Sequence, residues 1–116
     1  MKTYINTHGE IPLHTALSYD ANLSKWVIAQ DTQSLIVITS NLPYEENGEW
    51  SSEVLVSGNH IDIFADEDIP DQGGFLHIRN GRAYVDNTST GCGTIAPLSR
   101  GNDTRLAGTK ITVHLR

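Results

Sequence analysis

The chain contains one cysteine, one methionine and two phenylalanines among its 116 residues. A single cysteine cannot form an internal disulfide, which argues against a small secreted fold held together by disulfides. No apolar run approaches the ~18 residues of a membrane span, and residues 1–13 lack the apolar stretch of a signal peptide. We therefore expect a product that stays in a cytoplasm or is assembled there, with no membrane partner.

Basic residues are also scarce, and the net charge is −6 at pH 7. This balance argues against a nucleic-acid partner, because such binders normally carry a basic surface. Residues 26–78 hold ten acids and no Lys or Arg, whereas residues 79–116 hold six bases and two acids. Either strands from the two halves interleave and mix these charges, or the surface has two signs suited to head-to-tail contact between copies. The second interpretation predicts an oligomer interface at Asp66, Glu67, Asp68, Arg79, Arg82, Arg100 and Arg105.

Strand-forming and turn-forming residues dominate what is present. Val, Ile and Thr number 28, and Asn, Asp, Gly, Ser and Pro number 39. β-Branched side chains favour strands, and the second group favours turns. This composition predicts an all-β fold, a small β-barrel or sandwich, and excludes a coiled coil or helical bundle.

The clearest local signal is Asn80-Gly81, which predicts a type I′ hairpin with a solvent-exposed tip. Residues 110–116 alternate strictly, so Ile111, Val113 and Leu115 are expected to face the core. The continuous apolar run 35–39 predicts a strand covered on both faces. In all, strands are expected at 25–29, 35–39, 50–57, 60–65, 75–79, 82–86, 94–96 and 110–116.

Residues 1–15 are predicted to form an extended N-terminal arm, and residues 16–116 a single β-barrel-like domain. The apolar side chains of the arm are too sparse to nucleate a core but sufficient to anchor in a groove of a partner. The side chains predicted to bind that partner are Tyr4, Ile5, Ile11 and Leu13. The alternative is that the arm adds an edge strand to its own barrel.

Residues that carry chemistry form no recognisable motif. The five histidines lack the spacing of a local metal pair, and His77 and His114 are expected at the surface. Cys92 is expected to be a half-buried thiol, and the acids at 66–71 a solvated loop. The aromatic residues could form a sugar platform, or comprise a core tryptophan and scattered surface rings: Trp26, Trp50, Tyr44 and Tyr84. No enzyme, cofactor or metal site is predicted.

The order of several segments carries a family resemblance. These segments are Lys25-Trp26-Val27-Ile28-Ala29, the apolar run at 35–38, and the stretches 53–58, 61–65, 69–76, 80–83, 93–96 and 107–115. Over about residues 23–116 this order resembles the capsid decoration, or cement, proteins of tailed bacteriophages. The resemblance implies a β-barrel or β-tulip domain that assembles as a homotrimer on the outside of the head.

That resemblance implies a non-enzymatic structural function. The partners would be the major capsid protein and further copies of the chain, and the location would be the capsid exterior of the virion, after assembly in the host cytoplasm. A different class of function stays open, namely a carbohydrate- or receptor-binding β-domain of a lectin or phage fibre. Binding to a glycan array separates the two.

Overall fold

The computed structural model describes residues 2–98 and 105–116, and this part of the chain contains strands and no helix. No helix able to cross a membrane is therefore found among these residues. The strands are β1 (Lys2–Thr7), β2 (Ala16–Asp20), β3 (Lys25–Ile28), β4 (Val37–Thr39), β5 (Tyr44–Glu46), β6 (Glu49–Leu55), β7 (Gly58–Phe64), β8 (Gly74–Arg79), β9 (Arg82–Val85), β10 (Gly93–Ile95) and β11 (Lys110–Leu115). The prediction of an all-β fold is confirmed.

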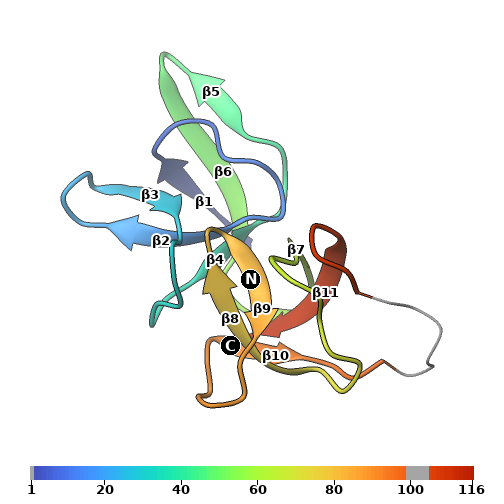
Figure 1. Cartoon of the computed structure of the whole chain (residues 1–116). Helices are drawn as coiled ribbons and strands as arrows, with labels where there is room; N and C mark the ends of the chain where they lie inside the picture. The colour runs from blue at the N-terminus through green and yellow to red at the C-terminus, as the bar shows by residue number, and fades with distance from the viewer. Residues whose placement is uncertain (1, 99–104) are drawn as a thin grey trace.

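The first six strands form a sheet that closes on itself (Figure 1). Strands β1, β3, β2, β4 and β6 pair in that order, and β6 pairs back to β1. The closing ladder is antiparallel and runs from Lys2 opposite Leu55 to Thr7 opposite Trp50. The result is a five-stranded barrel, with β5 added outside it as a hairpin on β6.

The last five strands form the second sheet, in the order β7-β11-β10-β8-β9. Its two outer strands approach each other where a parallel bridge joins Ala65, just after β7, to Ala83 of β9. In Figure 1 this sheet lies at the opposite end of the molecule from the β5–β6 hairpin. The molecule is elongated, with extents of 48 × 25 × 23 Å.

Two apolar clusters fill the fold. A small cluster inside the barrel consists of the buried Ile11, Leu17, Val37 and Val54. A larger cluster consists mainly of buried side chains of the second sheet. It also includes four residues from the barrel side, namely Ala16, Ala29, Ile36 and Ile38. Of the run 35–39, residues 36–39 are buried as predicted, because β4 has one cluster on each face, but Leu35 is 52% exposed. The larger cluster is therefore shared by the two sheets.

The N-terminal segment is extended, but its own chain orders it. The six residues of β1 pair with β6, and Ile11 is only 2% exposed inside the barrel. The expectation that residues 1–15 form an arm ordered only by a partner is therefore wrong for the described residues. The alternative, an edge strand added to the chain's own barrel, is closer to the structure, but β1 pairs with both β3 and β6 and closes the barrel instead of forming an edge. Sequence separation hid this pairing, because β1 and β6 lie far apart in the chain.

The Asn80-Gly81 hairpin forms as predicted, with φ of 51° and 76° at its two central residues. Its tip, however, is only partly exposed to solvent, because Asn80 is exposed but Gly81 is buried. The backbone N–H of Asn80 donates to the carbonyl of Gln30, and that of Gly81 donates to the carbonyl of Ala29. The tip thus docks on the segment that follows β3 and ties the second sheet to the barrel.

Replacing Gly81 with Val is expected to lower the free energy of unfolding by about 3 kcal/mol. The side chain would be strained at positive φ, and its Cβ would lie 2.8 Å from methyl carbons of Ile28 and Thr15. Gly48 is the matched control, since it also follows Asn in a turn, has φ of 81° and has no atom within 4 Å of the added Cβ. Urea unfolding of both variants measures the difference. Equal losses of unfolding free energy in the two variants would show that the contacts of residue 81 with the barrel add nothing to the strain of positive φ.

The prediction that His77 lies at the surface is wrong. It is 6% exposed, because the loops that carry Thr32 and Ser89 cover its face of β8. The ring Nε2 lies 3.2 Å from the carbonyl of Ser89, and Nδ1 lies 3.2 Å from Oγ1 of Thr32. That hydroxyl oxygen also accepts the N–H of Ile78 at 2.9 Å. His77 therefore fastens two loops to the second sheet.

Candidate functional site

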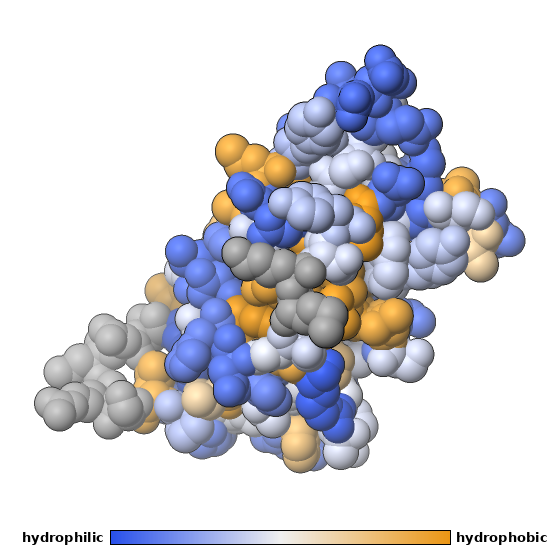
Figure 2. Space-filling view, turned by 180° about the vertical axis from the view of Figure 1, so that it is seen from behind, coloured by the Kyte–Doolittle hydropathy of each residue, from blue (hydrophilic) through white to orange (hydrophobic). Residues whose placement is uncertain are grey.

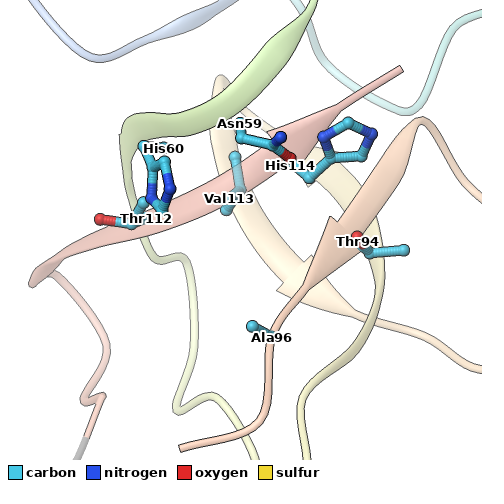
Figure 3. Close-up of a pocket in the computed structure, with 7 residues that line it drawn as sticks. All are labelled: Asn59, His60, Thr94, Ala96, Thr112, Val113 and His114. Carbon is cyan, nitrogen blue, oxygen red and sulfur yellow. The ribbon is translucent and has the colours of Figure 1, made fainter.

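A groove of about 340 Å³ opens on the outer side of the second sheet, where β10 and β11 part (Figure 3). Three strands and the segment after β10 supply its walls. Its lining residues are Asn59, His60, Thr94, Ala96, Thr112, Val113 and His114. Hydroxyl, amide and imidazole groups thus lie beside apolar surface that makes up most of the lining, so the groove can offer both hydrogen bonds and apolar contact.

At one end of the groove the two strands are in close contact. Gly93 lies opposite Leu115, and Thr94 lies opposite His114. A Cβ on Gly93 would stand 2.0 Å from the carbonyl oxygen of His114, so only glycine allows this approach. The backbone N–H of Arg116 donates to the carbonyl of Cys92 at 3.0 Å and extends the contact. This end of the groove is therefore fixed.

Beyond Thr94 the chain leaves β11. Gly73 approaches the carbonyl of Ile95 so closely that a Cβ on this glycine would lie 2.1 Å from that oxygen. The guanidinium of Arg105 donates to the carbonyl of Ala96 at 2.7 Å and to that of Pro70 at 2.8 Å. These contacts hold residues 95 and 96 toward the loop before β8, so the groove opens between them and β11.

The departure of β10 leaves an open backbone edge on β11. Alternate residues of a strand direct their N–H and C=O to the same side. Since Arg116 donates toward β10, Thr112 directs its backbone groups to that side as well. The position opposite Thr112 would fall to Ala96, but no hydrogen bond joins these two backbones in the described chain. An unpaired strand edge of this kind is a template for pairing with another extended chain.

His114 adds a second group without a partner. Its Nδ1 is buried and has no hydrogen-bond partner among the described residues. His114 was predicted at the surface, but it is half-buried, because it faces the contact between β10 and β11. Next to it, the hydroxyl of Thr112 donates to Asp62 at 3.1 Å, and the Lys110 ammonium lies 3.8 Å from the same carboxylate. These contacts hold the β7–β11 wall of the groove in place.

The charged residues predicted for an oligomer interface are largely engaged within the chain. Arg79 lies 3.2 Å from Asp66 and 3.3 Å from Glu67, and its guanidinium also lies over the ring of Tyr84. A carboxylate oxygen of Asp68 accepts the N–H of Ala107. These contacts agree with the alternative in which the two halves mix their charges.

Two of the other predicted interface residues have different surroundings. Arg105 holds the turn beside the groove, and Arg82 is exposed at the hairpin that contacts the barrel. Arg100 lies outside the described residues. Whether any of the seven side chains contacts another copy stays a prediction.

The four side chains predicted to bind a capsid are not equivalent. Tyr4 is exposed, Ile5 and Leu13 are half-buried, and Ile11 is buried in the barrel. Ile11 therefore cannot reach a partner while the barrel is closed, and that assignment is wrong. Capsid contact by the other three stays a prediction.

Cys92 is buried beneath the contact between β8 and β10. Burial raises the pKa of its thiol to about 11, which leaves little thiolate at neutral pH. The described residues contain no group of three His, Cys, Asp or Glu side chains that would hold a metal ion.

No family model, curated protein or solved structure matches the chain.

The groove depends on a close approach of glycines and on the turn held by Arg105, contacts between segments that are distant in sequence. Sequence reasoning missed it for that reason. The one local signal in the sequence is Pro97, which directly follows the strand expected at 94–96 and cannot donate a hydrogen bond to a strand ladder.

Proposed function

We propose that the chain is a non-enzymatic structural protein that binds the outside of a bacteriophage capsid as a decoration protein, assembled in the host cytoplasm and carried on the virion. Its partner in this proposal is an extended segment of the major capsid protein, which adds a strand to the open edge of β11. The resemblance of residues 23–116 to decoration proteins supports the choice of partner. The groove between β10 and β11 supports the mode of attachment.

The observation that carries the proposal is the backbone of Thr112, which no hydrogen bond of the described residues joins to Ala96, inside a groove of about 340 Å³. Main-chain hydrogen bonds to a sheet edge provide affinity for an extended peptide, and flanking pockets provide specificity. The buried Nδ1 of His114 and the hydroxyl of Thr94 lie where they would meet polar groups of the incoming chain. Such a site needs a rigid wall, which the Thr112–Asp62 hydrogen bond helps to supply.

Filling the groove tests this function. Ala96 is exposed and lines the groove, so Ala96→Trp places a large side chain there without removing a buried contact. We expect at least about tenfold weaker binding to purified capsids of the encoding phage, measured by co-sedimentation. Ala107→Trp is the matched control, because Ala107 is exposed in a turn and does not line the groove.

Three outcomes are distinct. Weak binding by Ala96→Trp and normal binding by the control support strand addition at β11. Normal binding by both variants contradicts this site and leaves capsid attachment standing. Absence of binding by the unaltered protein contradicts the proposed function itself.

We further propose that the chain acts as a homotrimer. The exposed Arg82 is the predicted interface charge for which no contact within the described residues is given above, and it would be available for a contact between copies. Light scattering of the purified protein is expected to give three times the chain mass of 12.7 kDa. A mass of one chain would contradict the trimer without bearing on capsid binding.

A further inference from the structure

A second groove lies at the opposite end of the molecule, on the outer face of the β5–β6 hairpin and β1. Its volume is about 290 Å³. Six of the residues that line it are Tyr4, Asn41, Leu42, Tyr44, Ser51 and Glu53. We call it the tyrosine groove. It shares no lining residue with the groove between β10 and β11.

The strand register explains how the tyrosine groove is built. Ser51 and Glu53 are two residues apart on β6, so their side chains lie on the same face. Tyr44 of β5 is opposite Ser51 on one side, and Tyr4 of β1 is opposite Glu53 on the other. The two rings therefore flank a polar floor, separated by two strand spacings, or about 10 Å.

The walls of this groove are unusually exposed for apolar side chains. Tyr4 is 76% exposed, Leu42 71% and Tyr44 61%. Each tyrosine carries a flat apolar face and a polar hydroxyl. A ligand that offers both C–H surface and hydroxyl groups matches such walls.

The polar groups of the groove are held in position before any ligand binds. The Tyr4 hydroxyl donates to Oε2 of Glu53 at 3.0 Å, and the Ser40 hydroxyl donates to Oε1 at 3.1 Å. A carboxylate can accept hydrogen bonds on both of its oxygens, which suits Glu53 to a ligand rich in hydroxyl groups. The side-chain carbonyl of Asn41 accepts the N–H of Leu42 at 2.8 Å, which directs the amide NH₂ outward as a donor.

The charge around the groove selects among ligands. Glu45, Glu46 and Glu49 lie on the same hairpin, and its end of the molecule is strongly hydrophilic (Figure 2). Of these, Glu49 has a basic partner, with Lys25 at 3.3 Å. An acidic rim repels phosphorylated, sulfated and sialylated molecules. We propose that the tyrosine groove binds an uncharged saccharide, with one pyranose face against a tyrosine ring and its hydroxyls on Glu53 and Asn41.

This binding activity is independent of capsid attachment, because it uses the other end of an elongated molecule. A decoration protein attached through β11 would present this groove away from the shell, and Tyr4 would then contact glycans instead of the capsid. The tyrosine groove is therefore where we place the carbohydrate-binding alternative that the sequence left open. Three of the four aromatic residues predicted for a sugar platform do not line this groove. Of Trp26, Trp50, Tyr44 and Tyr84, only Tyr44 lies here.

A glycan array with the full chain is the first test. We expect binding restricted to uncharged glycans, with no signal from sialylated or phosphorylated ones. The strongest uncharged glycan then serves as the probe for titration calorimetry and for saturation-transfer NMR. In the NMR experiment, the C–H protons of one pyranose face are expected to receive most of the saturation.

Matched variants locate the binding site. Tyr44→Ser and Glu53→Gln are each expected to weaken binding at least about tenfold. Tyr19→Ser is the control, since Tyr19 is also an exposed strand tyrosine but lies outside the groove. Thermal melting verifies that each variant is folded, and Asn41→Ala serves as a second groove variant if Glu53→Gln melts early.

An array without any bound glycan overturns the proposal, as does equal binding by acidic and uncharged glycans. Binding that survives both Tyr44→Ser and Asn41→Ala overturns the location. None of these results bears on the Ala96→Trp experiment, so the saccharide proposal and the capsid proposal fail separately.

Discussion

Val113→Asp is expected to abolish folding. Val113 is 2% exposed in the core that the two sheets share, on the inner face of β11. A carboxylate there would lose its hydration without gaining a partner, at a cost of at least about 4 kcal/mol. Small domains are stable by only about 5–15 kcal/mol, so most of the stability would be lost. Circular dichroism during heating is expected to record no cooperative transition.

The neighbouring residue provides the control. Thr112 is exposed, and Thr112→Asn retains a donor for Asp62, so a change within about 0.5 kcal/mol is expected. Thr112→Asp would not serve, because it places a second carboxylate directly opposite Asp62 in the ladder. If Val113→Asp melts like Thr112→Asn, the assignment of the faces of β11 is wrong.

Deletion of residues 1–12 is expected to unfold the barrel. It removes the six-residue ladder that closes β1 on β6 and leaves a hole in the barrel core at Ile11. Replacing one buried Ile by Ala costs about 2–5 kcal/mol, and the deletion removes more than that. Limited proteolysis and the melting curve measure the effect.

Tyr4→Ala is the matched control for the deletion, since it retains the backbone ladder and removes only an exposed ring. It is expected to melt within a few degrees of the unaltered chain. A truncated chain that still melts cooperatively, with unchanged protease resistance, would show that β1 is dispensable. The segment would then be free to act as the arm that the sequence suggested.

The elements that the sequence predicted correctly have strong local signals. Asn80-Gly81 marks its hairpin because few residue pairs tolerate positive φ at both positions. The inward-facing residues of β11 follow from alternation alone, and Ile111, Val113 and Leu115 are buried. In both cases, a few consecutive residues carry all the information needed.

The elements that the sequence did not predict depend on distant partners. β1 and β5 are poor in apolar residues, and both become strands by pairing with β6. His77 alternates like a surface residue but is covered by loops from two other parts of the chain. Both candidate grooves arise from such pairings, so their residues could not be grouped from spacing in the sequence.

The closure of the barrel by β1 and β6 also has a kinetic consequence. β1 leaves the ribosome well before β6, the strand with which it pairs, as the 49-residue separation of Tyr4 and Glu53 illustrates. Non-local pairing of this kind slows folding to the order of milliseconds to seconds. During synthesis β1 has an unsatisfied edge until β6 emerges, which exposes the nascent chain to aggregation. The yield of folded chain therefore depends on the time between the synthesis of β1 and the synthesis of β6.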